Sequence, residues 1–144
     1  MSSALDRLKD LTSKISSYEL SRKQNMKKLE KLYHSLHVDE KVYDFLELFE
    51  FKAINLSGIS LNEENFGEVQ EKKYVQIISI IYEPDAVVKN RNISLGYFGR
   101  SDKIDEKLKF DIIAFVLAWR FEKSFRTLEH YNILLERLPK ESDA

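Results

Sequence analysis

The chain has 144 residues, of which 43% are hydrophobic and 12% aromatic, and this composition excludes an intrinsically disordered protein. Its 23 basic and 24 acidic residues leave a net charge of −1, so no overall field attracts nucleic acid or anionic lipid. Cysteine is absent, which excludes disulfides, thiol nucleophiles and zinc sites built on thiolates.

The length suits a single domain, residues 1–144, that buries a real core. The N-terminal residues lack the apolar run of a signal peptide. The densest apolar stretch, residues 110–119, is about half as long as a membrane-spanning helix requires and contains Asp111. We therefore expect a cytoplasmic protein that does not contact membranes.

Charge is distributed along the chain in blocks. Residues 1–36 contain 8 basic and 4 acidic residues, whereas residues 37–71 contain 2 basic and 9 acidic ones. The neutral total thus conceals a basic segment followed by an acidic one, which can complement each other within one chain or between chains.

Residues 1–36 are predicted to form a long amphipathic helix of coiled-coil character. Apolar residues recur in it at alternating spacings of three and four. The positions that we expect to bind a partner are Leu8, Leu11, Ile15, Leu29, Leu32 and Leu36. The polar pair Arg22 and Asn25 interrupts this stripe, and such a pair either fixes helix register or marks a break within residues 21–25.

A second, acidic amphipathic helix is predicted for residues 37–56. Asp39 is a favourable N-cap, and Glu40 lies in the first turn, where the helix dipole favours negative charge. The apolar face of this helix consists of Val42, Phe45, Leu46, Phe49 and Ala53.

Residues 53–98 have the pattern of an antiparallel sheet with three to four strands. Residues 74–83 are β-branched and apolar on both faces, which is typical of a central strand. Residues 53–61 and 92–98 alternate polar and apolar side chains, as half-buried strands do.

The last predicted element is a long helix over residues 101–138. Ser101 or Asp102 would cap it, and Pro139 would end it. Its middle, residues 110–121, is apolar almost all round, which indicates a helix buried on most sides. The fold class is therefore α+β: two N-terminal helices, an antiparallel sheet and a long buried C-terminal helix.

Two of the three histidines, His34 and His37, could bind a metal together with Asp39 or Glu40. A third strong ligand is not evident, and the known two-histidine helical motifs contain further residues that are missing here. We interpret the segment instead as a junction, in which the histidines end one helix and Asp39 starts the next.

His130 follows Arg126 by four residues, a pair that a ribonuclease-like enzyme could use, although the spacing is shorter than in the helical ribonuclease motif. Pairing of side chains on an exposed helical face explains it more simply. The sequence has neither a glycine-rich phosphate loop nor a G-x-S-x-G motif. We therefore predict no catalytic residues, no metal site and no cofactor.

A basic ridge is the strongest charge feature of the first helix. It consists of Arg22, Lys23, Lys27, Lys28 and Lys31. Such a ridge could neutralise phosphates of a nucleic acid or meet an acidic protein surface. No aromatic residue is interleaved with it, so stacking on single-stranded bases is not indicated.

The hypothesis that follows is a non-enzymatic protein-interaction module, such as an adaptor, inhibitor, chaperone or regulatory subunit. We expect it to form a homodimer through the apolar stripe, although the stripe could instead fold back on the protein's own last helix. A nucleic-acid-binding regulator that uses the basic ridge is the alternative. A metal-dependent or ribonuclease-like enzyme is a weaker one.

Overall fold

The first element of the computed structural model is one uninterrupted helix. The model describes residues 3–141, and it describes only the backbone of residues 14–17. Helix α1 spans Ala4–Ser35, so the alternative of a break within residues 21–25 is wrong. Ser3 and Asp6 form a capping box at its start, and each side chain accepts a hydrogen bond from the other residue's backbone N–H. The helix ends at Leu36, after which His37 adopts a left-handed conformation with φ of 61°.

The predicted second α-helix is wrong. Two short 3-10 helices, Val38–Glu40 and Phe45–Glu50, lie within residues 37–56 in its place, and the first strand begins before this segment ends. The Asp44 side chain accepts the backbone N–H of Leu46 and so favours a local turn. The rest of the segment is held by distant partners, because the Trp119 Nε1–H donates to the Leu48 carbonyl at 2.8 Å. Tertiary contacts thus override the amphipathic pattern.

The sheet is antiparallel and has three strands among residues 3–141, the lower of the two numbers predicted. Strands β1 (Ala53–Ser57), β2 (Tyr74–Tyr82) and β3 (Asn90–Arg100) lie in the order β1-β2-β3. As expected, β2 is central, and it contributes three fully or almost fully buried side chains to the core: Val75, Ile77 and Ser79.

The long C-terminal helix is confirmed with a later start. Helix α2 spans Glu106–Glu136, and a separate 3-10 turn, Ser101–Lys103, precedes it. Its cap is therefore Asp105, whose carboxylate accepts the Leu108 N–H at 2.7 Å, rather than Ser101 or Asp102. The predicted burial of its apolar middle holds only in part: Phe115 and Val116 are fully inaccessible, whereas Phe110 is 50% exposed and Phe121 37%.

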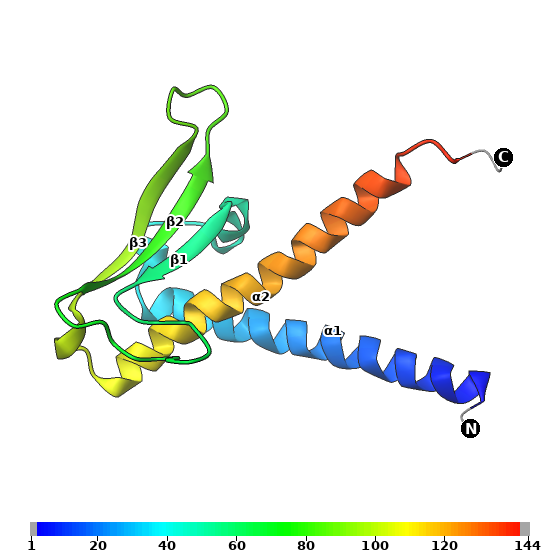
Figure 1. The fold of residues 1–144 in the computed structure, drawn as a ribbon, viewed down its shortest axis with the longest axis horizontal. Helices are drawn as coiled ribbons and strands as arrows, with labels where there is room; N and C mark the ends of the chain where they lie inside the picture. The colour runs from blue at the N-terminus through cyan, green and yellow to red at the C-terminus, as the bar shows by residue number, and fades with distance from the viewer. Residues whose placement is uncertain (1–2, 142–144) are drawn as a thin grey trace.

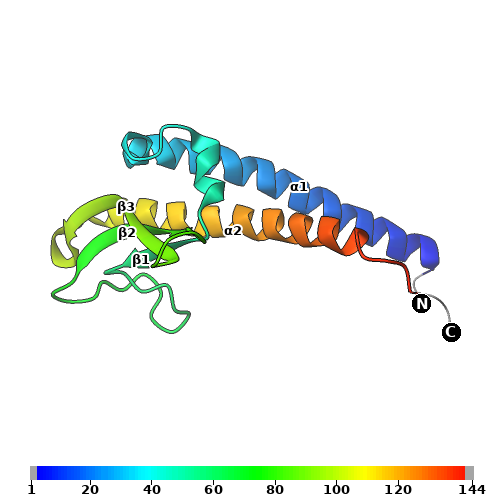
Figure 2. The ribbon, with the colours of Figure 1, turned by 90° about the horizontal axis from the view of Figure 1, so that it is seen from above.

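Helix α2 is the centre of the arrangement. It lies between α1 and the sheet, as the view in Figure 2 shows. Figure 1 shows that α2 crosses the second half of α1, and that the helices diverge from there toward the start of α1 and the end of α2. The core is formed around the crossing by the second half of α1, the 3-10 segments, the sheet and the first half of α2. The outer halves of both helices extend beyond it.

Candidate interaction site

The crossing of the two helices is fixed by polar groups. Arg22 donates from Nε and Nη2 to the two carboxylate oxygens of Glu122, at 3.0 and 2.8 Å. Arg126 donates from Nε to the same carboxylate at 2.9 Å, and only 2% of Glu122 is exposed. One turn further along α1, the Asn25 amide donates to the Ala118 carbonyl at 2.8 Å. The polar pair of the α1 stripe therefore sets where α1 meets α2.

The apolar stripe of α1 divides into two halves at this crossing. Leu29, Leu32 and Leu36 are buried in the chain's own core. Leu8 and Leu11 lie on the other side of the crossing and are 58% and 55% exposed. The side chain of Ile15 lies outside the described residues. The divergence of the helices in Figure 1 explains the division, because α2 no longer covers the stripe toward the N-terminus.

The outer half of α2 is exposed and apolar as well. We call residues 4–17 of α1 and residues 127–136 of α2 the helical arms. The arm of α2 carries large apolar side chains that are at least 40% exposed: Leu128, Tyr131, Ile133, Leu134 and Leu135. At the base of the arms, the ring centroids of Tyr18 and Phe125 lie 6.3 Å apart. The arms therefore form a V with apolar residues on both limbs.

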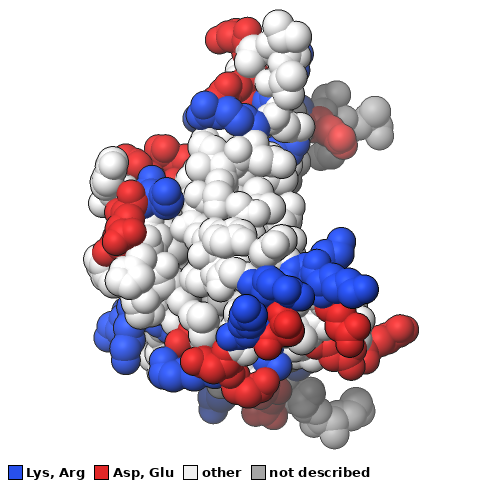
Figure 3. Space-filling view, turned by 90° about the vertical axis from the view of Figure 1, so that its left-hand side faces the viewer, with Lys and Arg blue, Asp and Glu red and all other residues white. Residues whose placement is uncertain are grey.

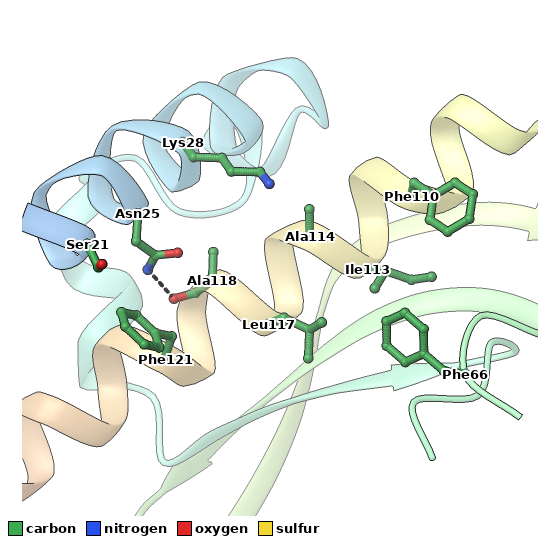
Figure 4. Close-up of a pocket in the computed structure, with 10 residues that line it drawn as sticks. All are labelled: Ser21, Asn25, Lys28, Phe66, Phe110, Ile113, Ala114, Leu117, Ala118 and Phe121. Carbon is green, nitrogen blue, oxygen red and sulfur yellow. Dashed lines mark hydrogen bonds between the residues drawn. The ribbon is translucent and has the colours of Figure 1, made fainter. Parts of the chain in front are cut away.

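An apolar groove lies beside the crossing, between α1, α2 and the loop that contains Phe66. Its volume is about 650 Å³. Figure 4 shows Phe66, Phe110 and Phe121 along the groove, with Lys28 above it. Half of the surface of Phe66 and of Phe110 is exposed. This groove adds a second apolar surface to that of the arms.

The basic ridge is divided between two roles. Arg22 belongs to the helix crossing, where Glu122 and Glu129 neutralise it. The other four members, Lys23, Lys27, Lys28 and Lys31, are exposed, and none of them forms an ion pair with residues 3–141. The surface of the ridge is therefore composed of lysines alone.

The histidines lie at a junction between elements. His34 Nδ1 lies 2.9 Å from a carboxylate oxygen of Asp39, and His37 Nδ1 lies 3.9 Å from one of Glu40. Within the part of the chain that the structure describes, no three His, Asp or Glu side chains come together as a metal site would require. His130 is exposed and contacts Tyr131, with ring centroids 5.9 Å apart, while Arg126 is paired with Glu122.

The sheet contributes an uncharged surface at the other end of the molecule. A broad band without charged residues runs down the view in Figure 3, with acidic and basic groups on both sides of it. Strand β2 contains no charged residue, and its terminal residues Tyr74 and Tyr82 are about half exposed. Tyr97 of β3 lies beside Tyr74, with ring centroids 5.8 Å apart, and is equally exposed.

Comparison of the chain with protein-family models, with curated proteins and with solved structures gave no match. No helix among the described residues has the length and apolar character needed to cross a membrane.

Sequence reasoning did not identify the buried ion pair at the crossing. Glu122 lies directly after the apolar run 110–121. A charged residue next to such a run could have indicated a buried ion pair. The partner Arg22 lies 100 residues away along the chain, so nothing local connects the two.

Proposed function

We propose that the protein is a non-enzymatic interaction module that self-associates through its helical arms. The observation that carries this proposal is the division of one continuous stripe: its second half is buried in the core, whereas Leu8 and Leu11 are more than half exposed. An amphipathic helix gains most of its stability from packing its apolar face, so a free half-stripe favours a partner.

A second copy of the chain suits the arms better than an unrelated partner. Each copy offers two apolar limbs that diverge from a fixed crossing, and a two-fold arrangement would bring the limbs of one copy against those of the other. Such packing of four helices is a common way to cover apolar stripes of this spacing. The uncharged band on the sheet and the groove beside Phe66 then remain for a further protein, in an adaptor or regulatory role.

Self-association is tested by replacing Leu8 and Leu11 together with glutamate. Sedimentation or light scattering of the unchanged chain is expected to give twice the mass of 17.0 kDa. The double variant is expected to associate at least about a hundredfold more weakly, because burying one leucine contributes about 1.5–3 kcal/mol.

Leu20→Glu is the matched control. Leu20 is 58% exposed and lies nine residues after Leu11, about two and a half turns, so it points to the opposite side of α1. This control is expected to leave the dimer intact. A strict monomer at high micromolar concentration, or equal effects of the two variants, would contradict the proposal.

Nucleic-acid binding by the basic ridge is the second candidate. The observation that favours it is the exposure of Lys23, Lys27 and Lys31, each without a carboxylate partner among the described residues. Three phosphate contacts would give a slope of about −2.7 in the logarithm of affinity against the logarithm of salt for a duplex.

Fluorescence anisotropy with a labelled duplex is the measurement. Changing the three lysines to glutamate is expected to abolish the binding, while the same change at Lys89, Lys103 and Lys140, exposed elsewhere, leaves most of it. Binding that is absent or insensitive to salt rules this function out.

A further inference from the structure

A second groove lies between the edge strand β1 and the outer half of α2. Its volume is about 610 Å³, within the range of small-molecule sites. Figure 1 shows α2 diverging from the sheet at this place. One side is lined by Lys52, directly before β1, and by Asn55 of β1, and the other by Arg120, Lys123 and Tyr131 of α2.

Three cations line this groove, and no acidic residue does. Arg120 donates from Nε to the Ile54 carbonyl at 3.2 Å and from Nη2 to the Asn55 side chain at 3.3 Å. Lys123 donates to the Phe49 carbonyl at 2.7 Å. Lys52 lies 3.4 Å from the Asn90 side-chain oxygen. All of these partners are neutral, and none of the three cations has a carboxylate partner within residues 3–141.

Lys123 contributes a half-buried ammonium group to the groove. Burial lowers the pKa of its ammonium group, and the neighbouring Arg126 lowers it further. The charge of an anion in the groove would oppose both effects, because it would favour the protonated ammonium group more strongly than the neutral carbonyl of Phe49 does. The site thus favours a ligand with a negative charge.

The remaining lining defines the body of that ligand. Trp119 forms the floor and is almost completely buried, while Leu128 and Tyr131 form an outer wall that is more than half exposed. The hydroxyls of Ser124 and Thr127 lie between the cations and this wall on α2. An aromatic and aliphatic wall next to clustered cations suits a ring system that bears an anionic group.

We propose that this groove binds a phosphorylated small molecule of nucleotide size, with its phosphate at Arg120 and Lys123 and its ring against Leu128 and Tyr131. The guanidinium of Arg120 is already oriented by β1, so a phosphate oxygen meets a donor whose rotamer is fixed. Leu128 and Tyr131 also belong to the arm of α2, whereas Lys52, Arg120 and Lys123 lie outside both arms. The phosphate end of this site is therefore separate from the surface proposed for self-association, and its ring wall borders that surface.

The test is calorimetric titration of the full chain with ADP and, separately, with inorganic phosphate. We expect saturable binding of ADP, with phosphate weaker because it lacks the ring. Lys123→Gln together with Lys52→Gln is expected to weaken ADP binding at least tenfold. Lys27→Gln together with Lys31→Gln removes the same two positive charges at exposed positions elsewhere, and is expected to change ADP affinity less than twofold.

Three outcomes overturn the proposal: no saturable binding of ADP at millimolar concentration, equal affinities for ADP and phosphate, or ADP binding that the groove variants leave unchanged. Tyr131→Ala provides a second test at an exposed position, where folding is not at risk. It is expected to weaken ADP binding severalfold and to leave phosphate binding unchanged. Light scattering on the same samples shows separately whether self-association persists.

Discussion

Replacing Glu122 with alanine is expected to lower the free energy of unfolding by about 3–5 kcal/mol. The carboxylate is 2% exposed and accepts hydrogen bonds from Arg22 and Arg126, so its removal leaves two guanidinium groups at the crossing without their shared partner. The Arg22 contact also joins the two long helices. Urea denaturation followed by circular dichroism measures the loss.

Glu129→Ala is the matched control for this prediction. Glu129 also accepts a hydrogen bond from Arg22, at 2.7 Å, but its side chain is 59% exposed. Solvent screens an exposed pair, so this variant is expected to lose less than about 1 kcal/mol. Comparable losses for the two variants would show that burial of the Glu122 carboxylate does not determine the strength of the crossing.

The same carboxylate makes the stability of the protein depend on pH. Burial alone would raise the pKa of Glu122, but the hydrogen bonds and charges of Arg22 and Arg126 outweigh burial and hold it below its usual value. A pKa that is lower in the folded chain contributes stability above the unfolded value of about 4.3, and this is lost as pH falls through the folded pKa. The difference in stability between the unchanged chain and Glu122→Gln is therefore expected to shrink below about pH 4.

The sequence predicted the two long helices and the central strand because each has a periodic pattern of its own. The segment 37–56 also has such a pattern, but its backbone carbonyls are bonded by side chains of other elements. Trp119 binds the carbonyl of Leu48, Lys123 that of Phe49, and the Tyr33 hydroxyl that of Val42. These donors outweigh the local preference for an α-helix, and no local pattern reveals them.

From the sequence, the residue types of the candidate site could be predicted, but not which residues lie together or which are exposed. The regular spacing of its apolar residues identifies the apolar side of α1. The spacing does not show at which residue of α1 the cover by α2 ends. The polar pair Arg22 and Asn25 predicted either a fixed helix register or a break, and its partners on α2 lie more than ninety residues away along the chain. The three cations of the groove between β1 and α2 also come from distant parts of the chain: Lys52 precedes β1, and Arg120 and Lys123 lie on α2. Clusters that form across such distances are set by tertiary structure.

Replacing Gly58 with alanine is expected to destabilise the fold by about 2–5 kcal/mol, more than the same change at Gly99. Both glycines have strongly positive φ angles, 88° and 90°, so alanine at either position adopts a backbone conformation that costs about 1–2 kcal/mol. At Gly58 a Cβ would also lie 2.6 Å from the Tyr74 carbonyl oxygen, whereas at Gly99 it would meet nothing within 4 Å. Thermal and urea denaturation of the two variants measure the difference.

The difference in stability between the two alanine variants reports how closely the backbone at the end of β1 approaches β2. The close contact at Gly58 involves backbone atoms of Tyr74, which move only if the strand moves, so relieving it costs a further 1–3 kcal/mol or so. Gly58 directly follows the last residue pair of the two strands, Ser57 with Gln76. Equal losses for the two alanine variants would mean that the strands are farther apart than in this structure. Lys52 and Asn55 would then not be held where the groove requires them.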